Sequence, residues 1–200
     1  MGILDYIFPK RCVVCKKNGS YLCEKCFSYL SFETRSICLI CHKFSINGLT
    51  HSNCLKKYEI NGCFSALSNS KTAQKLLYSF KQKPYLTDLK IVLGELFYES
   101  LIQNEAFNNE LKKEKWVFVP IPLSAAKLRK RGYNQAEILA KELSQKFNIP
   151  LGNLSQGRKS NKNIILVDDL VRTGTTLKEA AKALKKAGAK RVIGVTLVKQ

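Results

Sequence analysis

The spacing of apolar residues changes character near residue 61. Before this point apolar positions follow no regular period, and cysteines are spread among them. After it, stretches with the 3.6-residue period of an amphipathic helix alternate with short apolar runs typical of buried strands. This change predicts two parts, a small N-terminal module over residues 1–60 and an α/β domain over residues 61–200.

The pattern in the second part predicts a mostly parallel, twisted sheet with crossover helices. The predicted helices cover residues 72–81, 86–103, 136–147 and 177–187, with a break at Pro84, and the predicted strands cover residues 116–121, 164–167 and 192–198. Residues 104–115 are mostly polar and are predicted to form a surface connection. Residues 123–135 are rich in Arg and Lys and are predicted to form a loop at a strand end, suited to a pyrophosphate.

The stretch IILVDDLVRTGTT, residues 164–176, combines an apolar run, two acids and a polar loop. Its β-branched start predicts a buried parallel strand. Asp168 and Asp169 follow at the carboxyl end of that strand, where open α/β sheets bind their ligands. Two adjacent carboxylates repel each other and need partners, and neighbouring hydroxyls of a ribose would supply two donors.

The polar loop then opens a predicted helix. Its residues are Arg172, Thr173, Gly174, Thr175 and Thr176. Backbone N–H groups at a helix start, a glycine that permits close approach and several hydroxyls together make a cradle for a phosphate dianion. The strand, loop and helix therefore predict a ribose-phosphate site, with Asp168 and Asp169 as its candidate catalytic residues and the loop as its binding residues.

Blander and competing interpretations of this stretch fit less well. The acids could merely end a strand and the loop merely cap a helix. In that case one short segment would combine partners for a ribose and for a phosphate by chance. A receiver domain begins with a similar strand, yet only 31 residues follow Asp169. The nearest candidate for a nucleotide-binding P-loop is GNLSQGRKS, residues 152–160, which has Arg158 where Lys is required and a strand where a helix should follow.

Seven of the eight cysteines lie before residue 55, and most form pairs with two residues between them. The candidate metal ligands are Cys12, Cys15, Cys23, Cys26, Cys38, Cys41, His51 and Cys54. Eight such ligands suffice for two closed tetrahedral zinc sites, although their number and pairing, sequential or interleaved, stay open. A disulfide framework is the alternative, but we find no signal-peptide pattern. Cys63 is expected to be a small buried residue.

Zinc matters for folding in this part of the chain. About sixty residues with little apolar periodicity could hardly form a sufficient core, whereas a structural zinc site contributes on the order of 10 kcal/mol. We therefore expect removal of the metal to unfold the module.

The formal net charge of +19 predicts that the protein also binds a polyanion. Basic clusters occur at Lys127, Arg129, Lys130 and Arg131, at Arg158, Lys159 and Lys162, and at Lys178, Lys182, Lys185 and Lys186. A solvated helix face explains any one of them, but together they favour nucleic acid or an anionic membrane surface, with salt-dependent binding. No apolar run is long enough to span a bilayer, and the short apolar segment 1–9 is expected to pack on the module.

Residues 167–176 resemble the 5-phosphoribosyl-1-pyrophosphate (PRPP) signature of type I phosphoribosyltransferases, V-D-D-V-x-T-T-G-x-T. The matching residues are Val167, Asp168, Asp169, Thr173, Gly174 and Thr176, and Arg172 stands where Thr is usual. Together with PIPL at 120–123, RGYNQ at 131–135 and the preceding cysteine pairs, the motifs resemble the ComF family of competence proteins from about Arg11 to Val198.

This resemblance implies a type I phosphoribosyltransferase-like domain behind a zinc module. It implies a role in natural transformation, in the cytoplasm or at the inner face of the membrane, where incoming single-stranded DNA and other DNA-uptake proteins are the partners. By the same resemblance, Asp168 and Asp169 would hold the ribose hydroxyls, residues 172–176 the 5-phosphate, and Mg²⁺ the pyrophosphate of PRPP.

The leading hypothesis is a competence factor that handles single-stranded DNA and binds PRPP or a related sugar phosphate. The aromatic residues Tyr21, Phe27, Tyr29, Phe32 and Phe44 are candidates for base stacking, or else form core. An active phosphoribosyltransferase of base salvage ranks second, because only sixteen residues separate Phe147 from Ile164, where relatives carry a longer segment of the hood over the acceptor base. A zinc-finger regulator ranks third, because the cysteine pairs lack the C2H2 recognition-helix pattern. His51 takes the place of a cysteine that the family has in its last knuckle.

Overall fold

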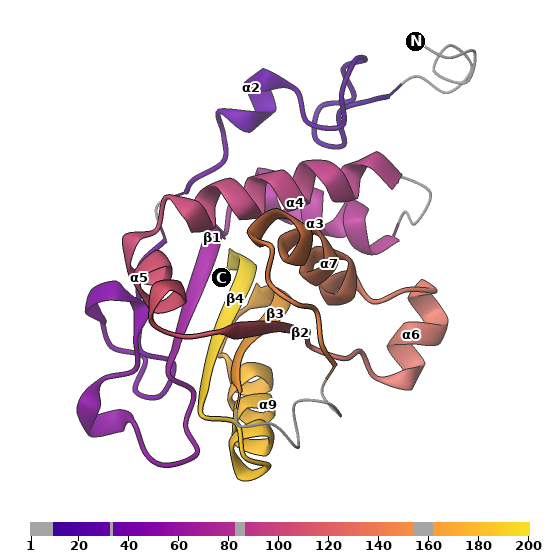
Figure 1. Cartoon of the computed structure of the whole chain (residues 1–200). Helices are drawn as coiled ribbons and strands as arrows, with labels where there is room; N and C mark the ends of the chain where they lie inside the picture. Colours follow the sequence, from indigo (N-terminus) through magenta and orange to yellow (C-terminus); the bar gives the residue numbers. More distant parts are fainter. Residues whose placement is uncertain (1–9, 33, 83–86, 154–161) are drawn as a thin grey trace.

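The sheet at the centre of the molecule contains four parallel strands. The computed structural model describes residues 10–32, 34–82, 87–153 and 162–200 (Figure 1). The strands are β1 (Gly62–Ser68), β2 (Trp116–Pro120), β3 (Asn163–Val171) and β4 (Arg191–Lys199), and their order in the sheet is β1-β4-β3-β2. Every strand pairing is parallel, so the predicted α/β class is confirmed.

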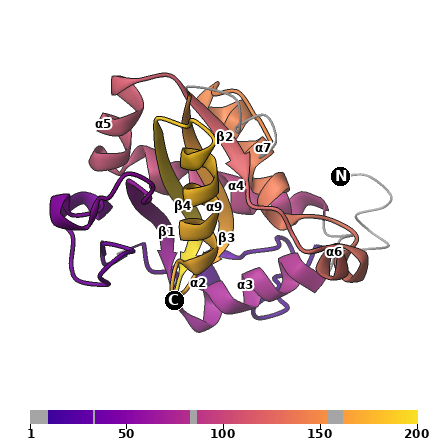
Figure 2. The ribbon, with the colours of Figure 1, turned by 90° about the horizontal axis from the view of Figure 1, so that it is seen from below.

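Helices cover both faces of this sheet. The helices within the described residues are α2 (Glu24–Phe27), α3 (Lys71–Gln82), α4 (Thr87–Ile102), α5 (Glu105–Lys113), α6 (Ala125–Arg131), α7 (Gln135–Phe147) and α9 (Thr175–Lys186), with short 3-10 turns η1 (Ile46–Gly48) and η2 (Ser52–Cys54). Figure 2 shows α9 in front of the sheet, with α4 and α7 behind it. The predicted helices and strands of the second part are confirmed within a few residues, except that β3 extends to Val171.

The central strand β3 is buried on both faces because its side chains alternate. Ile164 and Leu166 pack in the same apolar cluster as Leu177 of α9. Ile165 and Val167 point the other way and pack in the cluster that contains core residues of α4 and α7. A continuously apolar run is therefore what a strand between two helix layers requires.

The prediction of a polar surface connection over residues 104–115 is wrong. These residues form α5, which begins where the Asn104 side chain accepts a hydrogen bond from the Phe107 N–H at 3.0 Å. Phe107 is fully buried, and its ring meets Phe64 of β1 edge to face. Glu110 is also buried, and Lys113 and Arg191 pair with its carboxylate. A buried, neutralised glutamate looks polar in the sequence but faces the core.

Two further elements depart from the prediction. The basic segment predicted as a loop contains α6, which starts at the Ser124 cap and ends at Gly132, a residue with a φ of 78°. Strand β1 was not predicted, because its alternation of Gly, Cys, Phe and Ser is weakly apolar. The predictions for residues 1–9, Pro84 and most of the segment 152–160 lie outside the described residues.

The N-terminal part contains the same knuckle twice. In the first knuckle, the Lys16 N–H donates to the Cys12 carbonyl at 2.8 Å, and in the second the His42 N–H donates to the Cys38 carbonyl at 2.9 Å. Lys16 and His42 both adopt positive φ, 68° and 59°, which closes each turn behind its second cysteine. The first knuckle lies over α3 and α4, and the second lies on the sheet face covered by α9. The boundary at residue 60 stays a prediction.

Candidate functional site

The acid pair lies where β3 extends beyond its neighbour β2. The last residue of β2, Pro120, pairs with Val167, so Asp168 and Asp169 project past the end of β2. The Asp168 carboxylate accepts a hydrogen bond from the Asp169 N–H at 2.8 Å. The carboxyl end of the sheet thus presents both acids together, although they lie inside a longer strand than the sequence predicted.

The two acids differ in their partners. Asp169 is buried, and its Oδ2 lies 2.5 Å from Lys81 Nζ at the end of α3. Asp168 has no ion pair in the described part of the chain. Burial and the negative charge of Asp169 raise the pKa of Asp168 to about 7, while the Asp169 N–H and Lys81 oppose this rise. One lysine does not satisfy two carboxylates, so the pair favours an added cation or hydroxyl donors.

The Thr/Gly loop (residues 172–176) leads directly into α9. Gly174 stands at the N-cap with a φ of 70° and has no side chain to cap the helix, while the Thr175 N–H makes a long bond of 3.5 Å to the Thr173 hydroxyl. The Thr173 and Thr175 hydroxyls lie 2.9 Å apart, and the Arg172 side chain is exposed beside them. Backbone N–H groups at the start of a three-turn helix, with hydroxyls and a cation around them, suit a phosphate.

A third wall comes from α3 and the connection between α6 and α7. The Tyr133 hydroxyl donates to the Phe80 carbonyl, next to Lys81. Burial raises the pKa of Tyr133, and the nearby Asp169 raises it further, while Arg131 acts in the opposite direction. The RGYNQ segment therefore does face the acid pair, but most of the basic cluster lies on α6, whose residues are exposed.

Lys81 was not identified from the sequence. A lysine near the end of an amphipathic helix ordinarily reaches into solvent. Only the placement of α3 above the carboxyl end of β3 turns it toward Asp169.

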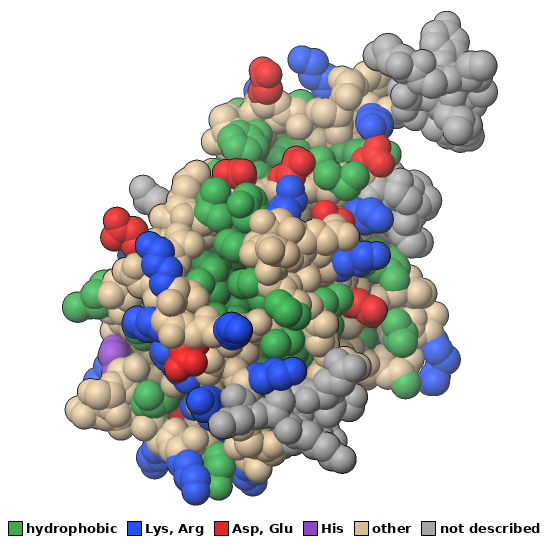
Figure 3. Space-filling model, in the orientation of Figure 1, with side chains coloured by type: hydrophobic (Ala, Val, Ile, Leu, Met, Phe, Trp, Pro, Cys, Tyr) green, Lys and Arg blue, Asp and Glu red, His purple; other side chains and the backbone are tan. Residues whose placement is uncertain are grey.

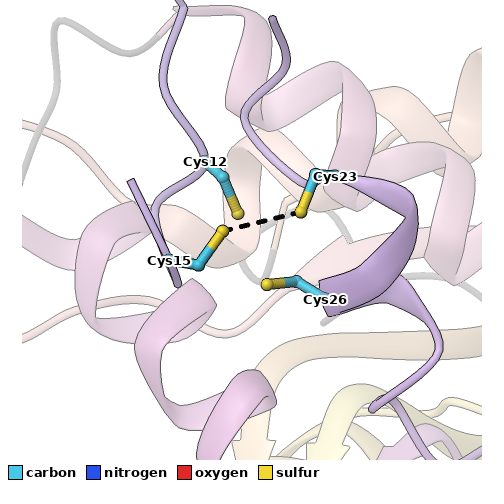
Figure 4. Close-up of side chains that lie close together, drawn as sticks. All are labelled: Cys12, Cys15, Cys23 and Cys26. Carbon is cyan, nitrogen blue, oxygen red and sulfur yellow. Dashed lines mark hydrogen bonds between the residues drawn. The ribbon is translucent and has the colours of Figure 1, made fainter. Parts of the chain in front are cut away.

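The first cysteine cluster comprises Cys12, Cys15, Cys23 and Cys26. Their sulfur atoms point toward one common centre, with Cys26 on α2 (Figure 4). All four lie within 4.8 Å of one another, and the Sγ atoms of Cys15 and Cys23 are 3.6 Å apart. Zn–S bonds of about 2.3 Å in a tetrahedron place ligand atoms about 3.8 Å apart, so the cluster fits zinc.

The second cysteine cluster comprises Cys38, Cys41, His51 and Cys54, again within 4.8 Å of one another. Cys41 Sγ lies 3.4 Å from His51 Nδ1, and His51 Nε2 lies 2.9 Å from the Phe44 carbonyl. A zinc-binding histidine typically uses its other nitrogen in this way to fix its orientation. The structure brings the eight predicted ligands into two clusters of four. Each cluster joins two ligand pairs that follow one another along the chain, whereas the sequence had left sequential and interleaved pairing open.

The thiols carry the electrostatic signature of a metal site. Burial alone would raise the pKa of Cys12, but backbone N–H groups of Cys15 and Cys23 lower it to about 6. Similarly, the N–H groups of Cys41 and His51 outweigh burial and lower the pKa of Cys38 to about 7. Burial and the neighbouring thiols raise the pKa of Cys26 to about 12. Four thiolates at such separations require a cation to ionise together.

Comparison with known proteins matches both parts of the chain. Residues 121–200 match the phosphoribosyl transferase domain, and residues 3–55 match the double zinc ribbon domain. The chain joins a double zinc ribbon to a phosphoribosyl transferase domain. Structural zinc is therefore confirmed, and so is the type I phosphoribosyltransferase-like fold.

Three relatives extend this comparison. Competence protein ComFC of Bacillus subtilis is 34% identical over 119 residues, covering 48% of this chain and 50% of the relative. Competence protein F of Haemophilus influenzae is 30% identical over 105 residues, covering 37% and 46%. A ribose-phosphate pyrophosphokinase of Buchnera aphidicola is 52% identical over 48 residues, covering 22% and 15%. The predicted resemblance to the ComF family is confirmed, and the chain spans about half the length of the competence proteins it matches.

The candidate stacking aromatics of the zinc ribbon separate into different environments. Tyr21 packs against the core, whereas Phe27, Tyr29, Phe32 and Phe44 are exposed. Phe27 and Phe32 line a groove of about 480 Å³ whose opposite wall, on α4, includes Glu95 and Glu99. Carboxylates repel a phosphate backbone, so this groove is poorly suited to DNA. Phe44, 71% exposed beside the exposed Lys43, has the more suitable surroundings.

The remaining predictions concern Cys63, the membrane and the charge. Cys63 is half-buried on β1, and burial raises the pKa of its thiol to about 12. Within the described residues, no helix is both long and apolar enough to cross a bilayer. Lysines and arginines are scattered over the face in Figure 3, among hydrophobic and acidic side chains, without forming one continuous patch there.

Proposed function

We propose that this protein is a competence factor that handles incoming single-stranded DNA and binds PRPP or a related sugar phosphate. The observation that carries the sugar-phosphate part is the acid pair together with the glycine N-cap of α9, within one strand, loop and helix. The names of the competence relatives and the net charge of +19 support the DNA part.

In this proposal each residue of the site has a binding task. Asp168 and Asp169 accept hydrogen bonds from the ribose hydroxyls, and residues 172–176 enclose the 5-phosphate with N–H groups and hydroxyls. Mg²⁺ would neutralise the pyrophosphate, and Asp168, which forms no ion pair within the described residues, is the residue suited to approach it. The chain thereby orients the sugar and balances its charge, and any group transfer through an oxocarbenium-like state would rely on that positioning.

Calorimetric titration with PRPP and Mg²⁺ tests the sugar-phosphate site independently of turnover. We expect binding to the wild-type protein and its loss in Asp169→Asn. Asp88→Asn is the matched control, because Asp88 lies on α4 and pairs with Lys10 instead. Absence of binding by the wild type, or equal binding by all three proteins, would contradict the proposal.

Fluorescence anisotropy with a labelled oligothymidylate tests the DNA part. We expect binding at low salt and a linear fall of log affinity with log salt concentration, because Lys and Arg displace counterions from the phosphates. No binding at low salt, or binding insensitive to salt, would contradict it.

Phosphoribosyl transfer to a base is the second candidate function. The complete acid pair and loop favour it, as does the likeness to a ribose-phosphate pyrophosphokinase. Pyrophosphate release would be measured across a panel of bases with PRPP and Mg²⁺. Robust turnover that is lost in Asp168→Asn would place transfer ahead of DNA handling. A duplex preference that depends on base sequence would instead favour the third candidate, a zinc-finger regulator.

We further propose that the protein acts in the cytoplasm, with other DNA-uptake proteins at the inner face of the membrane. The basic charge supports contact with anionic lipid. Co-sedimentation with vesicles containing phosphatidylglycerol, compared with neutral vesicles, tests the membrane contact.

A further inference from the structure

The second knuckle lies against the loop that begins α9. Leu39, between the ligands Cys38 and Cys41, is only 2% exposed. It belongs to the apolar cluster that contains Leu166 of β3 and Leu177 of α9. Leu39, which lies between two metal ligands in the sequence, is therefore part of the core beneath the candidate site.

This contact includes the backbone of Gly174. A methyl group placed on Gly174 would lie 2.8 Å from Leu39 Cδ2 and 3.0 Å from Cδ1, which is closer than carbon atoms approach without displacement. Gly174 also has a φ of 70°, a conformation that side chains other than glycine rarely adopt. Leu39 thus packs directly on the backbone of the turn that presents the N–H groups of α9.

The chain before the second knuckle is anchored to the carboxyl ends of β1 and β4. The Ser68 N–H donates to the Ser31 carbonyl at 2.8 Å, and the Thr34 hydroxyl lies 3.1 Å from the Ser65 carbonyl. The Lys199 ammonium donates to the Arg35 carbonyl. These bonds fix the approach to Cys38, and the second cysteine cluster holds the knuckle from its other side.

The first knuckle has the same ligand chemistry but different neighbours. Val13, between Cys12 and Cys15, packs in the cluster of α3 and α4. Lys75 of α3 donates to the Val14 carbonyl at 3.2 Å. The first cluster therefore supplies a matched comparison for the second.

We propose that Leu39 is a positioning residue for the Thr/Gly loop, and that zinc in the second cluster sets the affinity of that loop for a phosphorylated sugar. Zinc joins residues 38–41 to residues 51–54 and so holds Leu39 against Gly174. Without zinc in the second cluster, Leu39 would lose this restraint, and the N–H groups at the start of α9 would no longer be held in one arrangement. The choice of ligand rests on the proposed function, but the coupling between zinc and the loop does not.

Equivalent substitutions in the two clusters test the proposal. Cys41→Ser and Cys15→Ser each remove the second cysteine of a knuckle, and zinc content is measured for both. Ribose 5-phosphate binding would be measured by calorimetry. Amide hydrogen exchange would be measured in peptides covering residues 170–178. Cys41→Ser should accelerate exchange there and weaken binding about tenfold, a typical coupling between sites, whereas Cys15→Ser should change both much less. Equal effects of the two variants, or no effect of Cys41→Ser, would overturn the proposal.

A second pair of variants keeps both zinc sites intact. Leu39→Ala should retain the wild-type zinc content and yet show faster exchange at residues 170–178 and weaker binding. Val13→Ala, which shortens the equivalent side chain of the first knuckle, should change exchange and binding much less. If the wild type itself fails to bind ribose 5-phosphate, the proposed function fails, but hydrogen exchange still decides whether Leu39 positions the loop.

Discussion

At the scale of single residues, the site is defined by how unequally two neighbouring carboxylates are neutralised. Lys81 compensates Asp169, whereas Asp168, among the residues that the structure describes, has the neighbouring N–H and the more distant effect of the lysine. A ligand that brings hydroxyls or a cation to Asp168 removes the remaining repulsion. Two predictions follow from this difference.

Sugar-phosphate binding should depend on pH through Asp168. Its pKa in the folded protein is about 7, and only the ionised carboxylate accepts two hydroxyl donors. Affinity for ribose 5-phosphate should therefore rise about tenfold between pH 6 and pH 8, as the ionised fraction grows. Calorimetry on wild type and Asp168→Asn separates this effect from titration of the ligand phosphate. A variant with the same pH profile as the wild type would contradict it.

Lys81 should stabilise the fold through Asp169. The two side chains are 20% and 12% exposed, so Lys81→Met leaves a largely buried carboxylate without its cation. We expect the free energy of unfolding to fall by about 2–3 kcal/mol at pH 8, measured by urea denaturation. The double variant Lys81→Met/Asp169→Asn should recover most of this loss, because no charge is left buried. Additive losses in the double variant would show that the pair is not coupled.

At the scale of elements, α5 shows how a buried charge hides a helix from sequence analysis. Its polar residues mask two that face inward, Phe107 and Glu110. Arg191 of β4 reaches Glu110 and lies over the ring of Trp116 at the start of β2. The ion pair thus joins α5 to the amino ends of two strands.

Replacing Glu110 should be costly for this reason. Glu110→Gln removes the partner of two cations from a buried position, and we expect a loss of about 3 kcal/mol in unfolding free energy. Glu105→Gln, at an exposed position in the first turn of the same helix, should change stability by less than about 0.5 kcal/mol. Thermal or urea denaturation of both variants measures the difference, and similar losses would contradict a special role for Glu110.

At the scale of the whole molecule, the two zinc clusters attach to opposite faces of one parallel sheet. The first adds to the layer of α3 and α4, and the second adds to the layer of α9. Exposed aromatics therefore emerge in different electrostatic surroundings: Phe27 beside two glutamates, and Phe44 beside lysine.

Phe44 should contribute more than Phe27 to the binding of single-stranded DNA. Phe44→Ala should weaken oligothymidylate binding about tenfold or more, because a stacked aromatic contributes roughly 1–3 kcal/mol per base. Phe27→Ala removes another exposed ring, next to Glu95 and Glu99, and should have little effect. Anisotropy titrations at constant salt compare them, and a larger loss in Phe27→Ala would place DNA in the groove on α4.

Zinc removal should act on the whole molecule in a graded way. A strong chelator should unfold both knuckles, since each depends on its metal. Unfolding of the second knuckle should also disturb α9, because Leu39 and Ile60 pack in the same apolar cluster as residues of α9. Far-ultraviolet circular dichroism and hydrogen exchange measure this, and unchanged exchange in α9 after zinc loss would argue against a shared core.

The sequence alone determined the features that depend on local periodicity and spacing. The run before Asp168, the apolar faces of α7 and α9, and the metal ligands are visible because neighbouring residues suffice to define them. Tertiary structure alone decided which distant groups meet. It places Lys81 beside Asp169, Arg191 beside Glu110 and Leu39 beside Gly174. It also decides which two ligand pairs form each zinc cluster. Such contacts depend on how the layers pack, and burial reverses the ordinary meaning of a polar residue only after its partner has been placed beside it.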